Sequence, residues 1–222
     1  MKPLLAHIYE PHRVTYPCYV QPKLNGIRAL YQGGRFQSRD QLPFPAELLK
    51  HLAEPLLQVF DRETILDGEL YVHGWPLQRI NAAVTPVRQH PTEDTLKVEY
   101  HVFDVVNFQS GFWERYKPIK TIQRLVDSMV HHVPTTYVLS QQDADNMYAS
   151  FVSLGYDGMM SRLGDCLYTS PKQLIGSRGQ HRPKGASQSR FLSDKNNRVW
   201  HLLKRKDWQD DEYKCVGVVE GE

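Results

Sequence analysis

Residues 21–28 read QPKLNGIR and place a lysine and an arginine on either side of an Asn-Gly pair. The polar residues alternate with Leu24 and Ile27, a pattern that predicts a strand end or tight turn presenting charged groups to one side of a pocket. A deprotonated lysine amine can attack the α-phosphorus of a nucleotide and form a phosphoramidate. Nearby cations and burial disfavour the ammonium form, so they would favour that reaction. Lys23 is therefore the candidate nucleophile of the chain.

Four further stretches carry residue types that this chemistry needs. They are DGELY at 67–71, YHVFDVV at 100–106, YDGMMSR at 156–162 and WHLLKRK at 200–206. Alone, each is also typical of a turn into a strand or of a solvated basic edge. In this order they supply cations for phosphate oxygens, carboxylates for a divalent metal ion and ribose hydroxyls, and an aromatic face for a base. We therefore interpret all five stretches as parts of one site.

The five stretches resemble the motifs of covalent nucleotidyltransferases: ATP-dependent DNA ligases, RNA ligases and messenger RNA capping enzymes. Lys23, Gly26 and Arg28 match the first motif, K-x-D-G-x-R, with Asn25 in the aspartate's place. Residues 67–70 match the third motif, and residues 103–104 match the aromatic-acid motif that follows it. Residues 157–162 match the fourth motif, E-G-x-M-x-[KR], and residues 204–206 match the fifth, K-x-K.

Two further segments resemble ATP-dependent DNA ligases more than capping enzymes. They are Ser38-Arg39 and the closing DEYKCVGVVEGE. The resemblance implies an α+β, ATP-grasp-like nucleotidyltransferase domain of antiparallel sheets flanked by helices. Residues 1–222 would form a single adenylation domain, and the C-terminal OB-fold domain that such ligases normally carry is not present in this chain. We therefore expect slow self-adenylation and retained activity on a pre-adenylated nick.

The resemblance also implies a role for each polar or aromatic residue of the site. Lys23 would take AMP from ATP, with Lys204 and Lys206 as the other catalytic cations. Gln21 would contact the adenine edge, and Phe103 would stack on the base. Arg28, Lys204 and Lys206 would bind the phosphates. Glu69 would contact the ribose and, with Asp157, the Mg²⁺ ion. Asp157 is one methylene shorter than the family's glutamate, so we expect the metal geometry to shift by about one ångström.

The predicted reaction is ATP-dependent sealing of nicked double-stranded DNA, as in DNA replication and repair. Lys23 would take AMP from ATP with Mg²⁺, AMP would pass to the 5′-phosphate of the nick, and the 3′-hydroxyl would displace it. An RNA ligase and a guanylyltransferase share the lysine chemistry and stay open. A nucleic-acid-binding module that has lost activity through Asn25 and Asp157 is the alternative from another class.

A basic segment at 171–198 is rich in Gly, Ser, Gln and Arg and has almost no apolar periodicity, which predicts a surface loop. Its cations could neutralise DNA phosphates without reading sequence, although a solvated insertion with no DNA contact is nearly as good an interpretation. The expected nucleic-acid contacts are Arg39, Arg178, Arg182, Lys184 and Arg190.

The composition fits a protein with a real core, because 41% of its 222 residues are hydrophobic. With 27 Lys and Arg against 25 Asp and Glu, attraction to nucleic acid must come from local clusters of charge. Three cysteines without close spacing indicate neither a disulfide framework nor a zinc site. No segment is typical of a signal peptide or a membrane span, so we expect a monomeric cytoplasmic protein of a bacterial or phage-infected cell.

Short β-rich segments dominate the secondary structure that the pattern predicts. The expected strands are 18–20, 27–31, 64–72, 98–106 and 137–139. Apolar periodicity predicts helices at 47–59, where Pro55 must kink or end the helix, at 121–131, and at 143–154 with Gly155 as the C-cap. Strands mixed with unevenly spaced helices favour an α+β domain.

Overall fold

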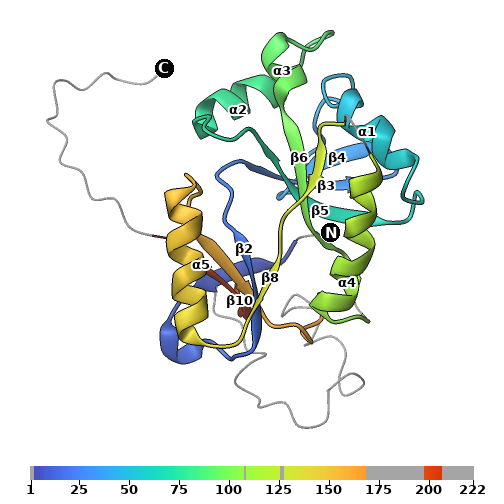
Figure 1. The fold of residues 1–222 in the computed structure, drawn as a ribbon. Helices are drawn as coiled ribbons and strands as arrows, with labels where there is room; N and C mark the ends of the chain where they lie inside the picture. The colour runs from blue at the N-terminus through green and yellow to red at the C-terminus, as the bar shows by residue number, and fades with distance from the viewer. Residues whose placement is uncertain (1–2, 108, 126–127, 169–197, 207–222) are drawn as a thin grey trace, which may run out of the picture.

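The computed structural model describes residues 3–107, 109–125, 128–168 and 198–206, and its helices and strands form two sheets flanked by helices (Figure 1). Sheet A has the strand order β1 (Leu5–Ile8), β10 (Arg198–Arg205), β9 (Met159–Arg162), β2 (Cys18–Pro22) and β8 (Thr136–Val138). Sheet B has the order β4 (Arg35–Ser38), β3 (Ile27–Gln32), β5 (Ile65–Tyr71), β6 (Glu99–Val105) and β7 (Val130–His132). The α+β class and the five predicted strands are confirmed.

The sheets are antiparallel except for one pair at an edge of each. β1 runs parallel to β10, and β6 runs parallel to β7. A parallel pair needs a crossover connection, and α4 (Phe112–Ile119) lies in the segment that joins β6 to β7. The predicted antiparallel sheets are therefore confirmed, with one parallel pair added at an edge of each.

Helices cover each sheet and bury its apolar face. The helices are α1 (Lys50–Leu57), α2 (Leu77–Val84), α3 (Glu93–Lys97), α4 and α5 (Gln141–Ser153), with short 3₁₀ helices at Pro11–Arg13 and Lys120–Arg124. α1 and α4 contribute to the core of sheet B, for example through Leu52 and Tyr116. α5 packs Tyr148 and Phe151 against sheet A, on which it lies in Figure 1.

The predicted helix at 143–154 is confirmed, and it begins earlier because of its N-cap. The Ser140 hydroxyl accepts a hydrogen bond from the Asp143 N–H at 3.2 Å, and the Asp143 carboxylate accepts one from the Ser140 N–H at 3.0 Å. Gly155 has φ +85° and ends the helix, as predicted. The N–H groups of Gly155 and Tyr156 bond the carbonyls of Val152 and Phe151, so this end of the helix is closed.

The predicted helix at 121–131 is wrong. The chain forms the 3₁₀ helix Lys120–Arg124, and β7 begins at Val130. Val130 pairs with Tyr100 of β6, and this tertiary pairing overrides the helical periodicity of the apolar residues. Residues 126–127, within the predicted helix, lie outside the described residues.

Two other predicted elements have different boundaries in the structure. The helix predicted at 47–59 occupies only Lys50–Leu57 and ends two residues after Pro55, as a proline inside a helix leads one to expect. Arg198 belongs to strand β10 and not to the basic loop predicted at 171–198, because it pairs with Leu5 of β1. Its guanidinium also donates to the Ala6 carbonyl at 2.8 Å. The rest of that predicted loop lies outside the described residues.

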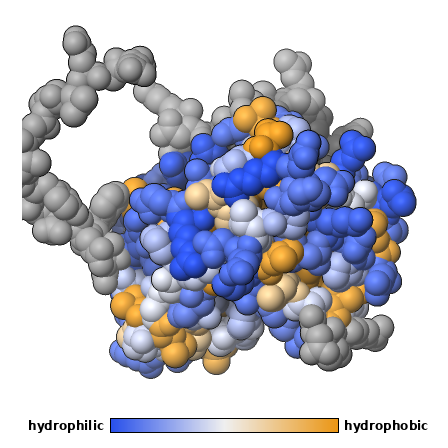
Figure 2. All heavy atoms as spheres, turned by 90° about the horizontal axis from the view of Figure 1, so that it is seen from above, coloured by the Kyte–Doolittle hydropathy of each residue, from blue (hydrophilic) through white to orange (hydrophobic). Residues whose placement is uncertain are grey.

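The surface seen from above, the side on which α2 and α3 lie in Figure 1, is mostly hydrophilic, with small separate groups of hydrophobic residues (Figure 2). This is the usual character of a solvent-facing surface. Across the described ranges, no helix combines the length and the apolar composition that a bilayer crossing requires.

Candidate active site

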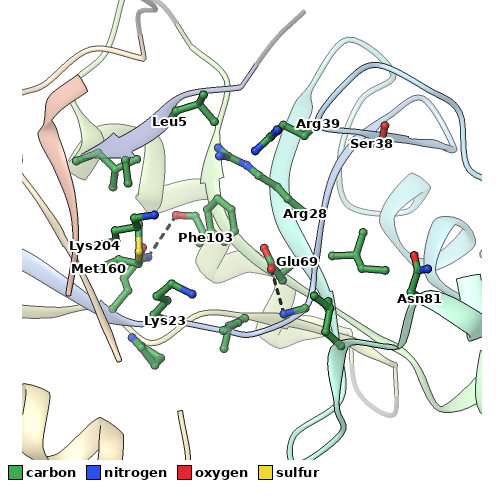
Figure 3. A pocket seen from close by; sticks show the side chains of 18 of the residues that line it. Leu5, Lys23, Arg28, Ser38, Arg39, Glu69, Asn81, Phe103, Met160 and Lys204 are labelled. Carbon is green, nitrogen blue, oxygen red and sulfur yellow. Dashed lines mark hydrogen bonds between the residues drawn. The ribbon is translucent and has the colours of Figure 1, made fainter. Parts of the chain in front are cut away.

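A cavity of about 690 Å³ lies between the two sheets, and both sheets supply its walls (Figure 3). Sheet A contributes residues of β1, β2, β9 and β10, and sheet B contributes residues of β3, β4, β5 and β6. The predicted site residues that line it are Gln21, Lys23, Arg28, Arg39, Glu69, Phe103 and Lys204. Five sequence stretches that are far apart along the chain therefore meet at one cavity.

Lys23 follows the last residue of β2 and faces Asp157 across a backbone pair. The Lys23 N–H donates to the Gly158 carbonyl at 2.9 Å, and the Asp157 N–H donates to the Lys23 carbonyl at 3.0 Å. The Lys23 ammonium forms an ion pair with the Asp157 carboxylate, and both side chains are mostly buried. Asp157 thus holds the Lys23 side chain at the cavity wall.

Gly26 forms the turn after Lys23 and approaches β5 closely. Its N–H donates to Glu69 Oε1 at 3.2 Å. A Cβ atom at this position would lie 2.2 Å from the Leu70 carbonyl oxygen and 2.9 Å from Glu69 Cγ. Glycine is therefore required for the turn to dock against the strand that carries Glu69.

Gly26→Ala is expected to slow the adenylation predicted for Lys23 by about 100-fold, because the turn must move by about an ångström and carry Lys23 with it. The rate of AMP incorporation from labelled ATP measures this effect. Gly74→Ala is the control for replacing a glycine outside the cavity lining: its φ of +79° strains an alanine there, but an added Cβ meets no atom within 4 Å. Equal rates in the two variants would contradict the role of this close approach.

Glu69 lies on the floor of the cavity between two cations. Burial raises the pKa of its carboxyl to about 7, although Arg28 and Lys23 oppose this effect. The carboxyl accepts the Gly26 N–H and can offer its other oxygen to a ribose hydroxyl or a metal ion. Near neutral pH it exists as a mixture of its acid and carboxylate forms.

A raised pKa in the folded state makes stability fall as the pH rises, since the unfolded chain loses its proton near pH 4.5 and the folded chain only near 7. The contribution of the protonated Glu69 carboxyl to the free energy of unfolding is complete below pH 4.5 and is lost above pH 7. The free energy of unfolding of the nucleotide-free protein, relative to that of Glu69→Gln, is expected to fall by about 3 kcal/mol between pH 4.5 and pH 8. Urea unfolding of both proteins measures it, and parallel pH profiles would contradict the assignment.

Arg28 is fixed by a bidentate ion pair with Asp67 of β5. Its Nε and Nη2 donate to the two carboxylate oxygens at 2.9 and 2.6 Å, and its Nη1 donates to the Leu4 carbonyl at 2.5 Å. The Tyr168 hydroxyl donates to the same carboxylate at 2.7 Å. Asp67 begins the DGEL motif but was not among the predicted site residues. Its contacts make it the group that orients Arg28 toward the cavity.

Gln21 is held by protein groups on both sides of its amide. Its Oε1 accepts from Arg162 Nε at 2.9 Å, and its Nε2 donates to Thr135 Oγ1 at 2.8 Å and to the Phe103 carbonyl at 3.3 Å. The Nε2 hydrogens that were expected to meet adenine are therefore engaged within the protein. Gln21 lines the cavity, and its part in reading the base stays a prediction.

Beneath Gln21, a fully buried network of charges supports this wall. The Asp104 carboxylate accepts from Arg115 at 2.8 and 3.1 Å and from Arg162 at 2.8 Å. Arg115 also donates to the carbonyls of Ser110 and Cys166, both at 2.7 Å. The sequence pattern gave no role to the two arginines. Arg115 lies 11 residues and Arg162 lies 58 residues from Asp104 along the chain.

Phe103 of β6 lies across the cavity from Met160 of β9 and Lys204 of β10 (Figure 3). An aromatic ring and a thioether on facing sheets offer apolar contact to a flat base. Burial, with repulsion from nearby cations that include Lys23 and Lys206, lowers the pKa of Lys204. Lys206 is exposed beyond the end of β10 and does not line the cavity, so its catalytic role stays a prediction.

Arg39 lies at the cavity mouth on the turn after β4, and its side chain is 59% exposed. The other predicted nucleic-acid contacts, Arg178, Arg182, Lys184 and Arg190, lie outside the described residues. Sequence patterns did not predict a wall formed by α2, which contributes Leu77, Gln78 and Asn81. Pro76 at the N-cap of this helix was the available signal.

Two carboxylates at the cavity suit a hard divalent cation. Glu69 lines the cavity and Asp157 is paired with Lys23 at its edge. Mg²⁺ prefers one or two carboxylates together with phosphate oxygens and water, so this donor set fits it. A bound Mg²⁺ would neutralise triphosphate charge.

Fold and site together define a two-sheet domain whose cavity brings a lysine together with other cations, a carboxylate and an aromatic ring. The family model described as ATP dependent DNA ligase domain matches residues 3–179. The chain belongs to this family.

Curated relatives include DNA ligases of African swine fever virus. The ligase of isolate Tick/South Africa/Pretoriuskop Pr4/1996 is 28% identical over 162 residues, covering 64% of this chain and 36% of the viral protein. That of isolate Pig/Kenya/KEN-50/1950 is 25% identical over 221 residues, covering 91% of this chain and 44% of the viral protein. The chain thus spans less than half the length of these relatives.

Solved structures of ligases share the fold. A Lig E DNA ligase superimposes with a TM-score of 0.68 at 18% identity, covering 93% of this chain and 69% of that one. The Chlorella virus DNA ligase-adenylate superimposes with a TM-score of 0.63 at 22% identity, covering 76% and 62%. These similarities confirm the nucleotidyltransferase fold predicted from the motifs.

Proposed function

We propose that this chain is a single adenylation domain that seals nicks in double-stranded DNA with ATP as the AMP donor. The observation that carries the proposal is the position of Lys23, at the wall of a cavity with cations and carboxylates from both sheets. Membership of the ATP-dependent DNA ligase family supports it.

In the first step, Lys23 Nζ attacks the α-phosphorus of ATP. The N–P bond forms, the bond from the α-phosphorus to the bridging oxygen breaks, and pyrophosphate leaves. Asp157, which is already paired with the ammonium, is proposed to hold Lys23 at the cavity wall for this attack. Arg28 and Lys204 would hold phosphate oxygens, while Phe103 and Met160 would enclose the base.

In the second step, an oxygen of the 5′-phosphate at the nick attacks the lysyl-AMP phosphorus and Lys23 is released as the amine. In the third step, the 3′-hydroxyl attacks the 5′-phosphorus, a phosphodiester forms and AMP leaves. Glu69 is proposed to contact the ribose and, with Asp157, to hold Mg²⁺. The protein is further proposed to act as a monomer in the cytoplasm of a bacterial or phage-infected cell, and the viral DNA ligases among its relatives fit an infected cell.

The acceptor is tested by incubating the protein with ATP and Mg²⁺ and a labelled nicked duplex of DNA or of RNA. Sealing of the DNA nick is the expected result. Faster sealing of the RNA nick would identify an RNA ligase, and labelling by GTP in place of ATP would identify a guanylyltransferase. Failure to seal a pre-adenylated DNA nick would contradict DNA ligation altogether.

The basic segment predicted at 171–198 is proposed to bind the phosphates of the duplex. Alanine in place of Arg178, Arg182, Lys184 and Arg190 together is expected to weaken nick binding and to reduce the salt slope, d log K/d log[salt], by up to about three units. The control replaces the exposed lysines Lys50, Lys97 and Lys117, which lie in short-range ion pairs. An unchanged affinity and an unchanged slope would remove this role.

A further inference from the structure

Three side chains on sheet B that do not themselves line the cavity bring metal-ligating atoms together. Glu99 and His101 stand two residues apart on β6, so they project from the same face of the sheet. His131 of β7 is paired with His101 across the parallel strands. Ligand atoms of all three lie within 4.8 Å of one another. The strand register therefore places two imidazoles and a carboxylate around one point.

The spacing of these groups is close to that of a bound metal ion. His101 Nε2 lies 2.7 Å from one Glu99 oxygen, and His131 Nε2 lies 3.8 Å from the other. Ligands at about 2.1 Å from a tetrahedral metal ion lie about 3.4 Å apart. Small rotations of the side chains would bring the three groups to that spacing, and no strand need move.

The donor set selects the class of metal. Imidazole nitrogens suit Zn²⁺ and its first-row neighbours, whereas Mg²⁺ and Ca²⁺ prefer oxygen ligands. Two histidines and one glutamate leave a fourth position for water. The side chain of His131 is 44% exposed, so solvent can reach that position.

The charges of the cluster also favour a cation. The hydrogen bond from His101 lowers the pKa of Glu99, which keeps this carboxylate ionised. Burial and the neighbouring His101 lower the pKa of His131, which keeps its imidazole neutral and able to bind metal near neutral pH. The two imidazole rings lie 5.1 Å apart, so protons on both would repel each other.

We propose that Glu99, His101 and His131 form a binding site for Zn²⁺ or a similar transition-metal ion, separate from the nucleotide site. None of the three lines the cavity, although His101 is paired in register with Glu69 on β5. The ion would join β7 to β6. The segment after β7 leads to Thr135, which holds Gln21, so the bound ion would also steady that wall of the cavity.

Binding of Zn²⁺ and Co²⁺ to the nucleotide-free, chelator-treated full chain tests the proposal. We expect one equivalent per chain, with visible Co²⁺ absorption of nitrogen and oxygen ligation, and a rise in Tm with Zn²⁺ that Mg²⁺ does not give. His131→Ala is expected to weaken binding by about 100-fold. His131→Asn repeats the test with a polar residue if the alanine variant is unstable.

Two controls separate this site from others. His90→Ala removes an exposed histidine elsewhere and is expected to leave the affinity unchanged. Glu69→Gln alters the cavity carboxylate and is also expected to retain the metal. Unchanged binding in the His101→Ala/His131→Ala double variant, or no stoichiometric binding to the wild type, would overturn the proposal. A loss caused by Glu69→Gln would assign the ion to the nucleotide site and overturn it as well.

Discussion

Lys23→Arg is expected to lower ATP-dependent nick sealing by more than about 10⁴-fold, since removing a nucleophile removes the covalent pathway. Arginine keeps the positive charge beside Asp157, but its guanidinium stays protonated at any working pH and offers no free amine. The rate of sealing of a labelled nicked duplex measures the loss. Because the ion pair can persist, Tm should change little.

Two controls identify the lost step. A pre-adenylated nick bypasses the lysine, so Lys23→Arg should still seal it at a measurable rate. Lys50→Ala replaces an exposed lysine that is paired with Glu54. It should leave the sealing of the nick with ATP and the sealing of the pre-adenylated nick unchanged. ATP-dependent sealing by Lys23→Arg within tenfold of the wild-type rate would contradict the assignment of the nucleophile.

Asp104→Ala is expected to lower the free energy of unfolding by about 3 to 5 kcal/mol, because it leaves the buried guanidinium groups of Arg115 and Arg162 without their carboxylate. For a chain of this size, the corresponding fall in Tm is about 6 to 15 °C. Urea and thermal unfolding measure the two quantities.

Asp94→Ala is the matched control for this prediction. Asp94 also makes a bidentate pair with an arginine, Arg79, but both side chains are exposed. Exposed pairs contribute about 0 to 1 kcal/mol, so the expected loss is small. Similar losses in Asp104→Ala and Asp94→Ala would show that the buried network does not support the cavity wall.

Local patterns predicted the strands well because their alternation and turn residues are local properties. β2, β3 and β5 lie where Val, Ile and Tyr alternate between turns. The C-cap signal of Gly155 also placed the end of α5, whereas its N-cap, Ser140, was not predicted. The pattern at 121–131 failed because Val130 gains more from pairing with Tyr100 than from a helical turn, and that partner lies 30 residues away.

The motifs predicted that several polar and aromatic residues would meet at one cavity, as they do, but did not give their contacts. Asp157 was expected at the metal ion and is paired with Lys23, 134 residues earlier. Gln21 was expected to read adenine, and its amide is engaged by Arg162, 141 residues later. Such contacts depend on strand order and register, which no local spacing reveals. The pairing of His101 with His131 has the same origin.

The central claim is that Lys23 becomes covalently adenylated, and intact mass after incubation with ATP and Mg²⁺ tests it most directly. The wild type should gain the mass of one AMP, pyrophosphate should reverse the gain, and Lys23→Ala should show none. An adduct that persists in Lys23→Ala, or a wild type that gains no mass under conditions in which it binds ATP, would contradict the claim.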